Sequence, residues 1–263
     1  MLKYLLKYDL KYIFKFIIIF YSLALFFGTL SRIFLSIENS LVMEIIGRIC
    51  SCTAISMMFS ILINNLMRLW VRFKQNLYGD ESYLTHTLPV KKQTLYMSKI
   101  ITAVISVFVS VIVIALTLYI TYYSKENIEF LKNLILPFAD IYGSSVLKII
   151  LAFLVVFFLE FANILQAGFT GIILGHKMNS AKTGFSVIYG FLVYIATQVF
   201  AVVVMLIFGL FNDDFMNLFV TKSAIDIGAV KAVVWLAIAV YSISLIIIYF
   251  VNQFLFKKGV NVD

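Results

Sequence analysis

Residues 100–122 read IITAVISVFVSVIVIALTLYITY and contain no charged side chain. A helix needs about 20 mostly apolar residues to cross the hydrocarbon core of a bilayer, so this stretch predicts a membrane-spanning helix. Five other stretches have the same character. The expected spans are residues 16–35, 45–66, 100–122, 146–174, 185–210 and 230–250.

The composition of the whole chain agrees with this pattern. Apolar residues make up 63% of the 263 residues and charged residues only 13%, which excludes an ordinary soluble domain. We therefore expect an all-α, polytopic membrane protein that forms one transmembrane domain over residues 1–263, with little chain left for a soluble domain.

The distribution of positive charge predicts the orientation, because Lys and Arg are retained on the cytoplasmic side during insertion. With the N-terminus inside, about two-thirds of the 21 Lys and Arg residues lie on the inner side, including Arg72 and Lys99. Both termini are then cytoplasmic, in a multi-pass protein of the cell membrane. The net charge of +8 faces anionic membrane lipid rather than nucleic acid.

The N-terminal segment carries Lys3, Lys7, Lys11 and Lys15 at intervals of four residues, with leucines on the other flank. This spacing predicts an amphipathic helix over residues 2–15 that lies in the inner interface of the membrane before the first span. A basic flank that only sets the topology is the alternative. The segment has no small-residue cleavage site, so it is expected to be retained.

The longest inner connection, residues 76–99, reads NLYGDESYLTHTLPVKKQTLYMSK. It begins with a turn and has a second break at Leu88 and Pro89, so a short helix is expected between them. Tyr and Leu beside charged residues suit a surface that docks another protein. The candidate contact residues are Gly79, Asp80, Glu81, Tyr83, Leu84, Thr85, His86, Leu88, Pro89, Lys91 and Lys92.

Together with the start MLKYLLKYDLK, this connection resembles the permease subunits of ABC-2-type transporters from Gram-positive bacteria. The resemblance implies an exporter in which a coupling helix, carried over to residues 79–89, contacts a cytoplasmic ATPase subunit. It also implies a second permease subunit, as in a homodimer of this chain, and two ATPase subunits that hold ATP and Mg²⁺. No cofactor is expected in this chain, which has no G-x-x-x-x-G-K-[ST] phosphate loop.

Glu160 is an acidic residue near the centre of an expected span, where it costs about 2.5–3.5 kcal/mol on insertion scales. Asn163 lies on the same helical stripe and the small residues Ala167, Gly171 and Gly175 continue it, which predicts close packing of another helix. The two polar residues either line a translocation route, with Glu160 as a protonatable switch, or form an interhelical hydrogen bond.

Three other functions remain open on the sequence alone. A stand-alone channel would need polar positions repeated around a pore, and no such pattern is present. An intramembrane enzyme would combine Glu160 with His86 or His176, which the topology places at the inner edge. An accessory or sensory subunit would bind the ATPase without forming the route. The sequence predicts no metal site. The expected spans offer few polar groups, which favours an apolar or amphiphilic cargo.

Overall fold

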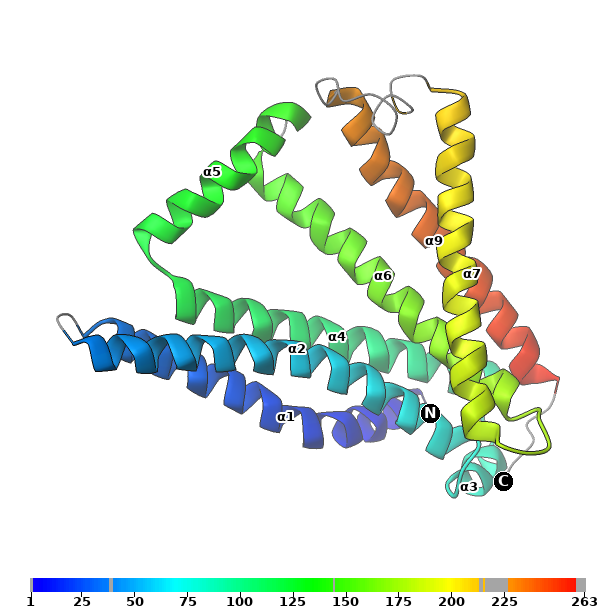
Figure 1. Ribbon diagram of the computed structural model, residues 1–263. Coiled ribbons are helices and arrows are strands. Elements are labelled where there is room, and N and C mark those ends of the chain that lie inside the picture. The colour runs from blue at the N-terminus through cyan, green and yellow to red at the C-terminus, as the bar shows by residue number, and fades with distance from the viewer. Residues whose placement is uncertain (1, 38–39, 144, 213–214, 216–226, 259–263) are drawn as a thin grey trace. The chain divides into compact units, whose positions relative to one another are not determined.

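The computed structural model describes residues 2–37, 40–143, 145–212, 215 and 227–258, and every regular element among them is a helix (Figure 1). Six of the helices are long and apolar enough to cross a membrane, so the chain has the fold of a multi-pass membrane protein. These six are α1 (Leu2–Leu35), α2 (Leu41–Leu77), α4 (Lys92–Tyr122), α6 (Val146–Gly175), α7 (Lys182–Leu210) and α9 (Ile227–Lys257).

The helices extend beyond the apolar stretches that predict them. Residues 2–15 and 16–35 form one continuous helix, α1, so the expected N-terminal helix is not a separate element. Helix α2 continues past residue 66 to Leu77, and α4 begins at Lys92 rather than at residue 100. Hydropathy detects only the part of a helix that matches the bilayer, and these ends carry charged side chains.

Two further helices lie in the connections. Helix α3 (Ser82–Thr87) is the short helix expected between the two breaks of the inner connection. Helix α5 (Lys125–Tyr142) occupies the connection that follows α4, for which the sequence predicts no regular element. The chain divides into two compact units, one up to Ile128 and the other from Glu129 to Asn261.

In the first unit α1 packs against α2 and α4, and the three helices run side by side (Figure 1). The buried face of α1 recurs every three or four residues, as expected for one side of a helix. Its members are Asp9, Ile13, Ile17, Tyr21, Ala24, Gly28 and Ser31. At Gly28 a Cβ atom would lie 2.7 Å from Thr121 Oγ1, so the missing side chain allows α1 to approach α4 closely.

Polar side chains connect the three helices inside this unit. Tyr21 and Ser110 share a hydrogen bond of 2.7 Å. Asn65 donates to Ser110 Oγ at 2.7 Å and accepts from Ser106 Oγ at 3.0 Å. Between membrane helices such bonds and small side chains favour association, because lipid offers no alternative partner.

In the second unit α6 packs against α7 and α9. The contact between α6 and α7 is closest at the small residues that the sequence singles out. A Cβ atom at Gly171 would lie 2.3 Å from the main-chain oxygen of Ser186, and one at Gly175 would overlap Ser186 too. Ala167 is buried on the same stripe. The small residues therefore let the two backbones come together.

Candidate functional site

A buried group of charges joins three helices at one end of the first unit. Asp9 of α1 accepts a hydrogen bond from Arg72 of α2 (Nε to Oδ1, 2.8 Å) and another from Lys99 of α4 (Nζ to Oδ2, 2.7 Å). The side chains of Asp9 and Lys99 are only 3% and 4% exposed. Each oxygen of one buried carboxylate thus holds one cation, and both contacts are charge-assisted.

Arg72 extends this group to the short helix α3. Its Nη1 donates to both carboxylate oxygens of Glu81, at 2.9 and 2.7 Å, while its Nε holds Asp9. The guanidinium carbon also lies 4.7 Å from the centre of the Tyr12 ring. Two acids and two bases balance in this group, which we call the α3 anchor: Asp9, Arg72, Asn76, Glu81, Thr85 and Lys99.

The inner side of α3 is held by the end of α2. Asn76 donates from Nδ2 to Glu81 Oε2 at 3.1 Å and to Thr85 Oγ1 at 3.0 Å. His86 Nε2 lies 3.0 Å from the main-chain oxygen of Leu77. Ser82 and Thr85 are buried. Helix α3 has only six residues, too few to be stable alone, so these contacts determine its position.

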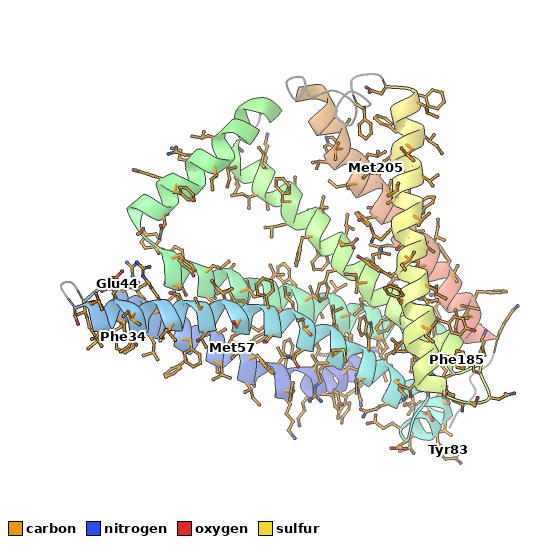
Figure 2. The ribbon with its side chains drawn as sticks, in the orientation of Figure 1. Phe34, Glu44, Met57, Tyr83, Phe185 and Met205 are labelled. Carbon is orange, nitrogen blue, oxygen red and sulfur yellow. The ribbon has the colours of Figure 1, made fainter. Side chains whose placement is uncertain are left out.

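The opposite side of α3 carries apolar side chains that no described residue covers. Tyr83 is 75% exposed and Leu84 is 69% exposed, and Leu88 directly after the helix is 42% exposed. Figure 2 labels Tyr83 on α3, at one end of the first unit. The α3 face, which we define as Tyr83, Leu84 and Leu88, is therefore an apolar surface on a firmly anchored helix.

The other residues proposed for the contact lie within α3 or in the chain on either side of it. Gly79 lies in the turn before α3, where its amide donates to the main-chain oxygen of Lys74 at 3.0 Å. Asp80, Pro89 and Lys91 are exposed, and Lys92 is half-buried at the start of α4. Of the eleven candidates, three hold α3 in place (Glu81, Thr85 and His86) and three form the α3 face. The other five lie directly before or after α3 in the chain.

An aromatic group supports the turn. Tyr78 is 1% exposed and packs against Phe73, which in turn meets the edge of Tyr96, with 6.3 Å between ring centres in each pair. Burial raises the pKa of the Tyr78 hydroxyl, so the phenol stays neutral. The turn that presents α3 is therefore fixed by a packed, uncharged core.

Asp9 is not among the site residues predicted from the sequence. Arg72 and Lys99 serve there only to predict the orientation of the chain in the membrane. One signal was available. Asp9 is four residues before Ile13 and eight before Ile17, so it belongs to the buried stripe of α1, whereas the neighbouring lysines belong to the exposed side. An acid on a buried stripe needs a basic partner, and only the fold shows which one.

The intramembrane pair lies in the second unit, between α6 and α7. Glu160 Oε1 accepts from Tyr194 Oη at 2.9 Å and from Gln198 Nε2 at 3.0 Å. Asn163 is fully buried and donates from Nδ2 to Thr197 Oγ1 at 3.0 Å. Both residues therefore make interhelical hydrogen bonds, as the structural alternative for this pair requires.

His176 lies far from Glu160 along the same helix. It follows the last residue of α6, and the rise of an α-helix places it about 24 Å from Glu160. Within the described residues no three His, Cys, Asp or Glu side chains come together as a metal site. Cys50 is buried, Cys52 is exposed, and both are free thiols.

No family model, curated protein or solved structure matches the chain. The fold therefore defines the class by itself: an all-helical protein with six helices able to span a membrane and a short anchored helix between the second and third of them. A functional assignment narrower than this class depends on the α3 face and on the α3 anchor.

Proposed function

We propose that this chain is the membrane subunit of an ABC transporter of the ABC-2 type, an exporter powered by a separate cytoplasmic ATPase. A second copy of the chain completes the route through the membrane. The observation that carries the proposal is the two-sided character of α3, whose polar side is bonded to the bundle while Tyr83 and Leu84 are exposed.

The positions of these residues favour a docking role. A surface that is to bind a partner needs apolar contact area with a polar rim, and in the sequence the α3 face is flanked by the exposed Asp80 and Lys91. The distribution of positive charge predicts that this end of the first unit faces the cytoplasm, on the side where ATP is available. The resemblance of residues 77–99 to ABC-2 permeases agrees.

The α3 anchor provides a path by which movement of an ATPase is transmitted to the membrane helices. A docking helix that moved freely would absorb the movement of an ATPase, whereas α3 is joined to α2 through Asn76 and to α1 and α4 through Arg72 and Asp9. Displacement of α3 then moves the ends of three helices together. Coupling is limited by the difference in the docking contact between the two conformations.

The test is the double substitution Tyr83→Ala and Leu84→Ala in the complete transporter, reconstituted with its ATPase. Removal of two exposed side chains leaves the anchor intact, so the helices should stay folded. We expect ATP hydrolysis to lose its dependence on cargo and transport to fall at least tenfold, as follows from loss of about 1.4 kcal/mol of docking energy.

The matched control is Leu118→Ala with Tyr119→Ala. These residues form the same kind of adjacent pair, 43% and 58% exposed, but near the opposite end of α4. Transport should be unaffected in the control. Normal coupling in the Tyr83 and Leu84 variant would rule out α3 as the docking element, and an ATPase that copurifies without any cargo movement would favour an accessory subunit.

A charge reversal tests the rim of the same surface. Lys91→Glu with Lys92→Glu changes four units of charge next to α3 while leaving its apolar face in place. If an acidic surface of the ATPase meets this rim, the variant binds the ATPase more slowly, and the loss diminishes at high salt. Equal ATPase binding by variant and wild type at low salt would remove the two lysines from the contact.

A further inference from the structure

Helix α5 (Lys125–Tyr142) joins two of the candidate membrane spans, and the docking role of α3 makes no use of it (Figure 1). Only residues 123–124 separate it from α4, and only residues 143–145 separate it from α6. An extended chain advances by at most about 3.6 Å per residue, so α5 begins within about 11 Å of the end of α4. Because α3 precedes the other end of α4, α5 begins on the side of the membrane opposite to α3.

Hydrogen bonds fix the corner between α4 and α5. Ser124 is the N-cap of α5, and its Oγ accepts from the main-chain amide of Asn127 at 3.0 Å. Asn127 in turn donates from Nδ2 to the main-chain oxygen of Tyr122 at 2.9 Å. At the other end of α5, Gly143 has a φ of +53°, the left-handed conformation that ends many helices. Helix α5 therefore has defined limits and is held to the end of α4.

The end of α4 carries the aromatic side chains that are typical of a membrane surface. Tyr119, Tyr122 and Tyr123 are 58%, 36% and 45% exposed, and the ring centres of Tyr119 and Tyr123 are 4.6 Å apart. Tyr is enriched where a bilayer meets water, because its ring is apolar and its hydroxyl group is polar. Helix α5 begins directly after these residues, at the depth of the lipid headgroups.

The described side chains of α5 divide into an apolar and a polar side. The apolar members Ile128, Phe130 and Leu134 are 45%, 63% and 51% exposed. The polar members lie three and four positions apart on the other side and are exposed too: Glu129, Lys132 and Asn133. Among the described helices none packs extensively against α5. The apolar side of α5 thus needs a partner that the described chain does not supply.

We propose that α5 is a lipid-binding helix that lies in the membrane surface opposite to α3, with its apolar side among the acyl chains and its polar side in water. Its 18 residues extend for about 27 Å and include five charged side chains, so it is too short and too polar to cross the bilayer. Acyl chains lie directly beside the end of α4, to which α5 is held. Helices of this kind insert by about 5–10 Å.

The charges of α5 indicate which interaction holds it at the surface. Two lysines and three acids give the helix a net charge of −1, so anionic headgroups do not attract it. Burial of the apolar side must therefore supply the binding. The start of α1 is different, because its lysines carry only positive charge on the exposed side. We expect α5 to remain at the surface of a neutral bilayer and in high salt.

Spin labels on the full-length protein, in vesicles of a neutral phospholipid, test the proposal. Single cysteines replace Phe130 or Leu134 on the apolar side, and Glu129 or Asn133 on the polar side, in a background without Cys50 and Cys52. Oxygen dissolves in lipid and a nickel chelate in water, so collisions with each reagent report the surroundings of the label. The ratio of oxygen to nickel accessibility should be several-fold higher on the apolar side, with these labels about 5–10 Å below the phosphates.

Two labels elsewhere in the chain provide the standards. Phe108→Cys represents lipid, because this side chain is 60% exposed in the middle of α4, and Asp80→Cys represents water. Equal nickel access at positions 129, 130, 133 and 134 would place α5 in water and overturn the proposal. Low access of both reagents at positions 130 and 134 would overturn it as well, in favour of a protein surface, such as a second copy of the chain, against the apolar side.

A second set of variants separates apolar area from charge. Phe130→Asn with Leu134→Asn should raise the nickel access of a label at position 128 several-fold, because the helix loses most of its apolar side. Glu129→Gln with Lys132→Gln, the matched control, should leave this label unchanged. No change in the first variant, or release of the wild-type helix into water by salt, would contradict binding through the apolar side. The helix content of each variant shows that the other helices remain folded.

Discussion

Substitution of Asp9 by Asn tests the α3 anchor at its most buried point. The change keeps the shape of the side chain but removes the charge that Arg72 and Lys99 share. Loss of one partner from a buried ion pair costs about 3–5 kcal/mol, because the remaining charge stays buried. Lys99 has no exposed route to water, with 4% of its side chain accessible, so we expect a value in this range.

The measurement is reversible unfolding of the full-length protein in mixed micelles, followed by helix content. Glu44→Gln is the matched control, since Glu44 pairs with Arg48 at 2.6 Å but both side chains are more than half exposed. An exposed pair at this helical spacing is worth about 0.3–0.5 kcal/mol. Asp9→Asn should therefore lower the free energy of unfolding by several times as much as the control.

A double substitution separates the interaction between Asp9 and Lys99 from the other effects of each single change. Replacing Lys99 by Met together with Asp9→Asn removes both charges, so the ammonium group is no longer buried without its carboxylate, while Arg72 keeps its pair with Glu81. The double variant should be more stable than the sum of the single effects predicts, by about 0.5–3 kcal/mol. The reasoning is refuted if Asp9→Asn costs no more than Glu44→Gln, because water would then reach the carboxylate.

Two other predictions concern packing and orientation. Gly171→Ala should destabilise the second unit by about 1–3 kcal/mol, because its Cβ would meet the main-chain oxygen of Ser186, whereas Gly184→Ala, with open space around it, should be nearly neutral in the same unfolding assay. Tyr83→Cys in a cysteine-free background should react with a membrane-impermeant thiol reagent only from the cytoplasmic side, and Phe211→Cys only from outside. Reaction of the thiol at position 83 from outside would exclude a docking role for α3.

The six membrane helices could be predicted from the sequence because a span is a local property. About 20 apolar residues in a row are enough to define one, whatever the rest of the chain does. The ends of these helices could be predicted less accurately. The part of α2 beyond residue 66 carries Arg72 and other charged residues, so hydropathy excludes it although it remains helical to Leu77.

The short helix α3 could also be predicted, since turn residues and a proline mark both its limits. Its division into an inner and an outer side could not. The inner side depends on Arg72, Asn76 and the distant Asp9, and Asp9 lies 90 positions before its partner Lys99. Such pairing arises only when three helices come together, and no local pattern of charge specifies it.

The same limit applies to Glu160 and Asn163. Their place on one helical stripe follows from their spacing, and so does the close packing at Gly171. The identity of their partners does not, because Tyr194, Thr197 and Gln198 are about 35 residues further along the chain and form part of another helix. In the structure Glu160, an acid that is costly to place alone in a membrane, is therefore part of a hydrogen-bonded group formed by two helices.

The central claim is that the α3 face binds an ATPase. A photo-crosslinking amino acid at position 83, in the full-length chain and in native membranes, tests it most directly, with the same substitution at Phe211 as control because that side chain is 86% exposed. We expect position 83 to crosslink to a subunit that carries a G-x-x-x-x-G-K-[ST] phosphate loop, and position 211 not to do so. Absence of such a subunit at position 83, in a complex that contains one, would contradict the account.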